Sequence, residues 1–94
     1  ITGAPKRRAM ELIDRLESDA RGFYCGTIFA FEPARRSLTA SIAIRTASIS
    51  DGEARYGAGG AVTLLSDPDD EADETIVKAE AFLRATNATL EGWQ

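Results

Sequence analysis

The sequence predicts an α+β fold in which a helix is followed by three antiparallel strands and a second helix. Apolar residues recur at helical spacing near both ends of the chain, whereas the middle alternates apolar and polar residues with the period of a strand. The turn signal Ser50-Asp51-Gly52 separates two of the strand-like segments. Because short turns join antiparallel neighbours, these features predict a three-stranded meander between the helices.

The first predicted helix covers about residues 5–17. Pro5 is tolerated there because the N–H groups of a first helical turn have no partner within the helix. The apolar residues of this segment are spaced three and four apart and should face a core: Ala9, Met10, Ile13 and Leu16.

The three strands are predicted at residues 23–31, 38–45 and 53–65. The first is rich in aromatic residues and is bounded by Gly22 and Pro33. The second alternates strictly between apolar and polar or small residues. The third carries the glycine-rich segment, residues 57–60, in its middle.

The second helix is predicted at residues 68–85, and a tail from Asn87 to Gln94 follows it. Pro68 suits a first helical position, and Ser66 or Asp67 suits the cap. The start is acidic, with six carboxylates in the eight residues from Asp67 to Glu74.

Glu71, Glu74 and Lys78 share one face of this helix because they are spaced three and four apart. Two carboxylates one turn apart can hold a hard cation such as Mg²⁺ together with waters and an anionic ligand. A nearby lysine can bind a ligand carboxylate as a point charge. The alternative is purely structural: acidic residues favour a helix N-terminus, and Glu74 with Lys78 forms an ordinary i,i+4 pair.

The predicted hairpins bring a second set of polar groups together. A first hairpin that pivots between Ala34 and Arg35 places Tyr24 opposite Arg45, and a second at Asp51-Gly52 places Arg45 opposite Ala58. A guanidinium, a phenol and the backbone N–H groups of Gly57 and Gly59 could then bind carboxylates. Alternatively, Arg45 is a solvated strand residue and Tyr24 a core residue, and a slip of one residue would break the alignment.

Composition limits the function classes. The 94 residues suffice for one small domain, and the net charge of −4 without a basic stripe argues against nucleic-acid binding. No apolar run could cross a bilayer. The single Cys25 and the absence of histidine disfavour disulfides and zinc, so we expect a cytoplasmic setting and an oxygen-liganded metal. Since the chain starts at Ile1 without Met, we expect a piece of a longer protein.

Several ordered motifs resemble the C-terminal end of the chorismate-utilising enzymes, a family that includes component I of aminodeoxychorismate synthase and of anthranilate synthase. The resemblance spans nearly the whole chain, and it implies that residues 1–94 are the C-terminal segment of a chorismate-binding domain whose N-terminal part is missing. The motifs are Ile1-Thr2-Gly3-Ala4-Pro5-Lys6, Arg8-Ala9-Met10-Glu11-Leu12-Ile13, Tyr24-Cys25-Gly26, Ile44-Arg45-Thr46, Gly57-Ala58-Gly59-Gly60, Ser66-Asp67-Pro68 and Glu71-x-x-Glu74-Thr75-x-x-Lys78.

The resemblance implies roles for these residues. Glu71 and Glu74 match an acidic pair near Mg²⁺, and Glu74 is the expected direct ligand. The groups that match the family's carboxylate contacts are Tyr24, Arg45, the Gly57 and Gly59 backbone, and Lys78. The resemblance also implies that the catalytic lysine and a further metal-binding carboxylate lie upstream of Ile1, which leaves any catalytic residues within this chain unknown.

Within the family, the opening Thr2-Gly3-Ala4-Pro5-Lys6 is most like the aminating branches. The expected activity is Mg²⁺-dependent amination of chorismate to 4-amino-4-deoxychorismate, on the route to 4-aminobenzoate and folate. Ammonia would come from a glutamine amidotransferase partner. The chain would be one part of a large α/β/β/α fold, inactive alone and prone to self-association through its exposed apolar faces.

Two alternatives stay open at this point. One is component I of anthranilate synthase, which serves tryptophan biosynthesis and adds nitrogen at a different ring position. The other is a noncatalytic acidic α+β interaction module, which would show neither Mg²⁺ dependence nor an effect of Glu74→Ala on ligand binding.

Overall fold

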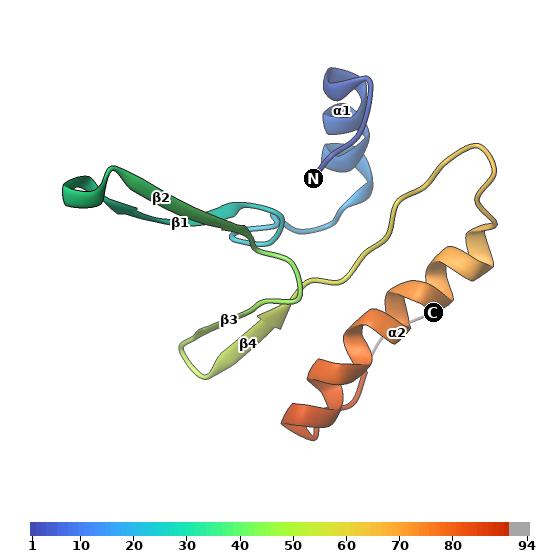
Figure 1. Ribbon diagram of the computed structural model, residues 1–94. Helices are drawn as coiled ribbons and strands as arrows, with labels where there is room; N and C mark the ends of the chain where they lie inside the picture. The colour runs from blue at the N-terminus through green and yellow to red at the C-terminus, as the bar shows by residue number, and fades with distance from the viewer. Residues whose placement is uncertain (91–94) are drawn as a thin grey trace. The chain divides into compact units, whose positions relative to one another are not determined.

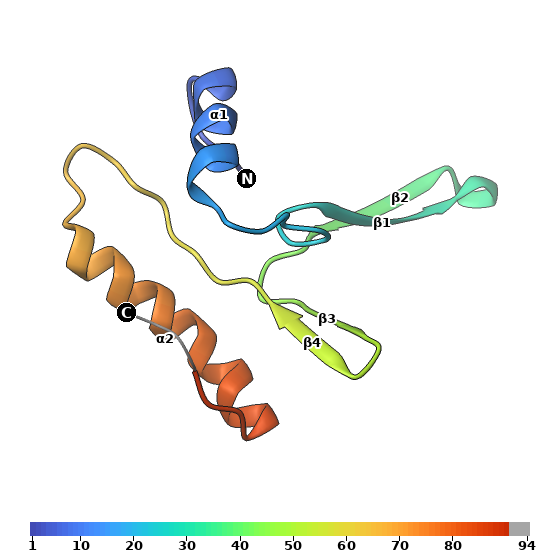
Figure 2. The same cartoon turned by 180° about the vertical axis from the view of Figure 1, so that it is seen from behind.

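The computed structural model describes residues 1–90 and divides into a first unit, Ile1–Ala43, and a second unit, Ile44–Gln94 (Figure 1; Figure 2 from behind). Residues 91–94, the end of the predicted tail, lie outside the described residues. Helices at both ends and antiparallel strands between them confirm the α+β class. The elements are α1 (Lys6–Leu16), β1 (Thr27–Glu32), β2 (Ser37–Ile42), β3 (Ala47–Ser50), β4 (Glu53–Tyr56) and α2 (Pro68–Thr86).

Helix α1 begins within one residue of its predicted start. Pro5 is its N-terminal cap, and the Pro5 carbonyl accepts the first helical hydrogen bond from Ala9 N at 3.0 Å. Glu17 closes the other end by donating its N–H to the Ile13 carbonyl at 2.9 Å. Its apolar face is open within this chain, since 79% of Leu16 is exposed.

Strands β1 and β2 form a hairpin whose register is the predicted one. Glu32 pairs with Ser37 and Thr27 with Ile42, so the hairpin pivots between Ala34 and Arg35 as expected. Alternation places one apolar set on a single face: Thr27, Phe29 and Phe31 from β1 with Leu38, Ala40 and Ile42 from β2. This face is open, with 64% of Phe29 exposed, which agrees with the expectation that the chain exposes apolar sheet surface.

Strand β1 starts later than predicted. The aromatic pattern suggested a strand from residue 23, but Phe23–Gly26 form a turn in which Gly26 N donates to Phe23 O at 3.0 Å. Cys25 has a left-handed backbone, with φ 64°, which no continuous strand accommodates. Beyond the ladder, Ala43 N donates to Gly26 O and Cys25 N donates to Ala43 O, so two residues oppose one in a bulge. Ala43 is buried there, with 2% exposed.

Strands β3 and β4 form the second hairpin, also in the predicted register. Ala47 pairs with Tyr56 and Ser50 with Glu53. Asp51 and Gly52 both have positive φ, 51° and 77°, as in the two-residue turns that match the twist of paired strands.

The three-stranded meander holds only approximately, because the strand predicted at residues 38–45 ends early and a further strand, which was not predicted, follows it. Strand β2 ends at Ile42 and β3 begins at Ala47, which leaves two separate two-stranded sheets. Arg45 lies between them with φ 50°, a left-handed conformation that interrupts a strand. The third predicted strand is also shorter, since β4 ends at Tyr56, directly before Gly57. Glycine has no side chain to pack on a sheet and weakens a strand interior.

Helix α2 agrees with its predicted bounds almost to the residue. Asp67 caps it, with its Oδ1 accepting from Asp69 N at 2.9 Å and from Asp70 N at 3.2 Å. The helix ends at Asn87, whose φ of 53° is typical of a left-handed C-terminal residue. In the described part of the chain, no helix combines the length and the apolar character needed to cross a membrane.

Candidate functional site

Most of the candidate site residues belong to the second unit. Glu71, Glu74 and Lys78 lie on α2, Gly57 and Gly59 lie on the segment between β4 and α2, and Arg45 lies between β2 and β3. Tyr24 belongs to the first unit.

The carboxylates and the lysine lie on one face of α2 as predicted. Glu74 Oε1 and Lys78 Nζ form an ion pair at 2.5 Å, with side-chain exposures of 54% and 30%. This is the i,i+4 pair of the structural interpretation. It also holds the ammonium group beside the carboxylate that the metal hypothesis requires.

The glycine-rich segment approaches this face of α2. Lys78 Nζ donates a hydrogen bond to the Gly59 carbonyl at 3.2 Å. A Cβ at Gly60 would lie 3.0 Å from Glu71 Oε2 and 4.0 Å from Lys78 Nζ. A side chain at position 60 would therefore crowd the end of the flexible Glu71 side chain, which would have to shift by a few tenths of an ångström. These contacts bring the glycine backbone, an acid and a cation together within one unit.

Arg45 lines an open pocket of about 400 Å³ in the second unit. The other lining residues are Tyr56, Val77, Lys78, Ala81 and Phe82. Within residues 1–90 the Arg45 guanidinium forms no ion pair, so its donors can face a ligand. A pocket with two cationic side chains and an aromatic wall suits an anionic ligand that has an apolar body.

Two residues of this pocket were missed by the sequence analysis. The rings of Tyr56 and Phe82 stack with centroids 4.4 Å apart and an interplanar angle of 5°. Tyr56 Oη also lies 3.5 Å from the Lys78 carbonyl, at the limit of a hydrogen bond. Two sequence features could have indicated these residues. Tyr56 directly precedes the glycines, and Phe82 lies at the edge of the apolar face of the helix.

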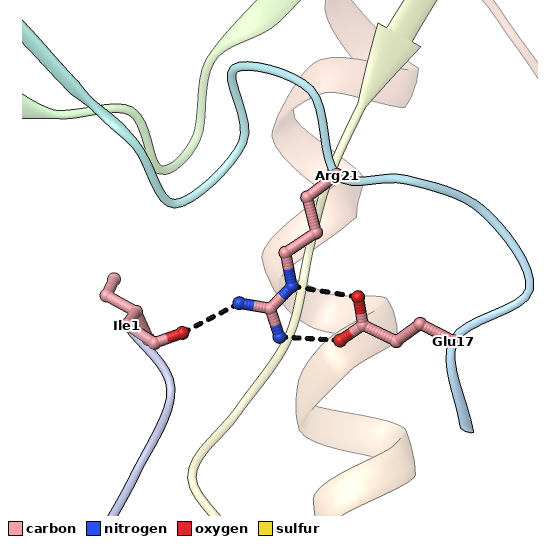
Figure 3. A network of polar contacts seen from close by, with 3 residues as sticks. All are labelled: Ile1, Glu17 and Arg21. Carbon is pink, nitrogen blue, oxygen red and sulfur yellow. Dashed lines mark hydrogen bonds and ion pairs between the residues drawn. The ribbon is translucent and has the colours of Figure 1, made fainter. Parts of the chain in front are cut away.

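A polar network in the first unit joins Arg21 to Ile1 and Glu17 (Figure 3). The Arg21 guanidinium forms two hydrogen bonds to the Glu17 carboxylate, at 2.5 and 2.8 Å, and donates a third to the Ile1 carbonyl at 2.7 Å. The guanidinium carbon also lies 5.8 Å from the centre of the Tyr24 ring, within cation–π range. Arg21 therefore ties the start of the chain and the end of α1 to the turn that carries Tyr24.

The protonation states in this network follow from its contacts. The hydrogen bonds from Arg21 lower the pKa of Glu17 below its usual value, and the same bonds raise the pKa of Arg21. Burial raises the pKa of the Tyr24 phenol, and the neighbouring Cys25 adds to the effect. The Tyr24 hydroxyl therefore stays protonated at neutral pH and can donate a hydrogen bond to an anion.

The alignment of Tyr24, Arg45 and Ala58 stays a prediction. Both hairpins have the predicted register, but neither ladder reaches Arg45, and the three residues are divided between the two units.

The residues present fit an oxygen-liganded cation in part. Glu71 and Glu74 supply carboxylate oxygens one turn apart on α2, and Mg²⁺ commonly takes one or two protein carboxylates and completes its shell with water and ligand oxygens. Across residues 1–90, no cluster of three or more His, Cys, Asp or Glu side chains could enclose a metal ion. A cation here would need further oxygen ligands from outside this pair.

The sequence is similar to known enzymes over almost its whole length. The sequence model of the family described as chorismate binding enzyme matches residues 1–84. The aminodeoxychorismate synthase of Streptomyces griseus is 50% identical over 98% of this chain and 13% of the relative. The chloroplastic aminodeoxychorismate synthase of Arabidopsis thaliana is 44% identical over 97% of this chain and 10% of the relative.

A second branch of relatives is nearly as similar. Anthranilate synthase component 1 of Pseudomonas putida is 47% identical over 90% of this chain and 17% of the relative. The chain thus spans well under a fifth of the length of these relatives. No solved structure matches the chain.

Proposed function

Because the chain belongs to the chorismate-binding enzymes, we propose that it is part of an enzyme that aminates chorismate to 4-amino-4-deoxychorismate. This step leads towards 4-aminobenzoate and folate. The similarity to aminodeoxychorismate synthases at 50% and 44% identity supports this branch. The small α+β fold is consistent with a fragment of the chorismate-binding fold, and we propose that it is the C-terminal segment of that domain.

One observation carries the proposal: the glycine-rich segment meets the acidic and cationic face of α2. The Gly59 carbonyl accepts a hydrogen bond from Lys78, and a Cβ at Gly60 would crowd the end of the Glu71 side chain. Chorismate carries two carboxylates, and we assign their binding to Arg45, Lys78 and the N–H groups of Gly57 and Gly59, with Tyr24 as a further donor. The open pocket beside Arg45 would take the apolar part of the ligand.

Mg²⁺ would be held by Glu74, with Glu71 beside it, and when bound it would hold the ring carboxylate and polarise loss of the ring hydroxyl. Glu74 is paired with Lys78 in the ligand-free chain. The Lys78 ammonium would bind a carboxylate of chorismate from the same face of the helix. The ion pair would keep Glu74 and Lys78 on one face of α2. The positive charge of Lys78 would also reduce the repulsion between the carboxylates of Glu71 and Glu74 in the ligand-free chain.

The remaining catalytic groups would come from the rest of the polypeptide, because the relatives extend far beyond the matched part. These groups include a catalytic lysine and a further metal-binding carboxylate. Ammonia would come from a glutamine amidotransferase partner, and this chain alone would be inactive. Anthranilate synthesis is the second candidate, favoured by the 47% identity to anthranilate synthase component 1.

The test is to express the full-length polypeptide that contains this chain and to identify its product from chorismate, Mg²⁺ and ammonia. We expect 4-amino-4-deoxychorismate. Anthranilate would favour the second candidate, and no turnover of chorismate would contradict both and favour the noncatalytic module.

Glu74→Ala tests the site within the same assay. Loss of a metal-binding carboxylate should reduce kcat/KM on the order of a hundredfold, and the Mg²⁺ concentration needed for half-maximal activity should rise. Asp73→Ala is the matched control, since Asp73 is an exposed carboxylate of the same helix outside the proposed face. Equal activity of the two variants would remove Glu74 from the metal site.

A further inference from the structure

We propose that Tyr56 and Phe82 are positioning residues that hold the glycine-rich segment against α2 for ligand binding. This inference rests on the proposed function for its link to chorismate. Tyr56 is the last residue of β4 and directly precedes Gly57, so any constraint on Tyr56 fixes the point from which the segment starts.

The stack with Phe82 supplies that constraint. The two rings lie nearly parallel, 5° apart, with centroids separated by 4.4 Å. Both residues are half-buried, although most large apolar side chains of the described chain are exposed. Such aromatic pairs contribute beyond the area they bury, so this contact links the end of β4 to the helix.

The contacts that follow run in order along α2. Tyr56 meets Phe82 and the carbonyl of Lys78, Gly59 meets the side chain of Lys78, and Gly60 lies beside Glu71. The segment therefore runs from the last turns of the helix towards its first turn, as both views indicate (Figure 1; Figure 2). Successive residues of the segment face the successive candidate groups of one helix face.

The glycine-rich segment gains more than an ordinary loop from a contact that orders it before the ligand binds. Gly57, Gly59 and Gly60 have no side chains to pack, and glycine loses more conformational freedom on ordering than any other residue. A ligand that uses these N–H groups must offset that entropy unless the segment is already ordered. The stack orders one end of the segment in advance, and the Lys78 hydrogen bond to Gly59 holds its middle.

This role predicts a specific kinetic pattern in the full-length enzyme. Tyr56→Leu and Phe82→Leu should each raise KM for chorismate roughly five- to tenfold, from the loss of a stacked pair, with kcat kept within about twofold. Tyr56→Phe should leave KM at the wild-type value, because this variant keeps the ring and loses only the 3.5 Å contact between the hydroxyl and the Lys78 carbonyl. The variant that combines both leucine substitutions should raise KM by less than the product of the two single increases, because each substitution removes the same contact.

A contribution to stability alone would give another pattern, in which the active fraction and hence kcat falls while KM stays the same. That pattern, or a Tyr56→Phe variant as impaired as Tyr56→Leu, would overturn the inference. Having two single variants keeps the test valid if one of them fails to fold.

Hydrogen–deuterium exchange supplies a readout that does not depend on chorismate chemistry. In Tyr56→Leu, the amides of residues 57–66 should exchange faster than in wild type, and in Tyr56→Phe they should not. Unchanged exchange in Tyr56→Leu would overturn the positioning role whatever the activity. Faster exchange in a full-length protein that does not turn over chorismate would support the anchor and contradict the proposed function.

Discussion

The two units hold their candidate ligand-binding residues by different forces. In the first unit, Tyr24 is held by Arg21, whose guanidinium bonds to the Glu17 carboxylate and the Ile1 carbonyl and lies against the Tyr24 ring. In the second unit, the glycine-rich segment is held by the stack of Tyr56 on Phe82. Charged contacts depend on pH and salt, whereas an aromatic stack depends mainly on shape, so the candidate residues of the two units should respond differently to the same conditions.

The exposed surfaces of the two units also differ in polarity. The first unit presents the apolar face of the β1–β2 hairpin, with Phe29, Phe31 and Leu38 exposed. The second presents a helix that opens with Asp69, Asp70 and Glu71. The first unit therefore exposes apolar sheet surface, and the second exposes the acidic start of a helix.

The largest expected effect comes from Arg45→Ala in the second unit. If Arg45 binds a carboxylate, its loss should cost about 1.5–3 kcal/mol, and KM for chorismate should rise roughly ten- to hundredfold. Arg45→Lys should recover part of this loss, because lysine keeps the charge without the two-pronged geometry. Steady-state kinetics of the full-length enzyme measure both, and an unchanged KM in Arg45→Ala would contradict the assignment.

A smaller effect is expected from Arg21→Ala in the first unit. The side chain is 24% exposed and touches no proposed ligand, so its loss should loosen the Tyr24 turn and raise KM only about fivefold, equivalent to ~1 kcal/mol. Arg84→Ala is the control, since Arg84 makes an i,i+4 pair with Glu80 that is far more exposed. If both variants had the same KM, the network would have no role in positioning Tyr24.

The smallest expected effect is on stability at acid pH. It compares the charged contact of the first unit with the aromatic contact of the second most directly. Arg21 lowers the pKa of Glu17 below about 4.5, so the unfolded chain binds the proton more readily than the folded one. The stabilisation is therefore complete above pH 4.5 and is lost as the pH falls through the lower, folded pKa. The difference in unfolding free energy between wild type and Glu17→Gln should be constant from pH 7 to 5 and shrink below 4.5.

Urea unfolding at several pH values measures this difference. The corresponding difference for Phe82→Leu should not change with pH over the same range, because the stack is an aromatic contact without an ion pair. A Glu17→Gln difference that persists at pH 3 would show that the carboxylate charge is not what stabilises the turn.

Much of the fold was predictable because strong local signals coincide with the elements. Pro5, Asp67 with Pro68, and Asn87 mark the helix ends, and the structure places the ends within one or two residues of the predictions. Both hairpin registers were predicted correctly, because alternation and turn position together fix which residues pair.

The interruption of the strands was not predictable from the pattern. Alternation continues through Ile44 and Arg45, yet Arg45 adopts a left-handed conformation, and a single φ angle leaves no trace in hydrophobic periodicity. The stack of Tyr56 on Phe82 was missed for a related reason, since it joins residues far apart in sequence. For the site, helical spacing predicted the shared face of Glu71, Glu74 and Lys78, but not the approach of Gly60 to Glu71.

If Arg45 binds the ligand, its left-handed backbone sets thermostability against ligand binding during evolution. With φ 50°, the position disfavours every residue that has a Cβ, by roughly 1 kcal/mol relative to glycine. A laboratory selection for heat resistance alone would therefore enrich glycine at position 45, and the resulting population would lose the guanidinium. The persistence of arginine at such a position under a combined selection would show that its side chain is retained for binding at the expense of stability.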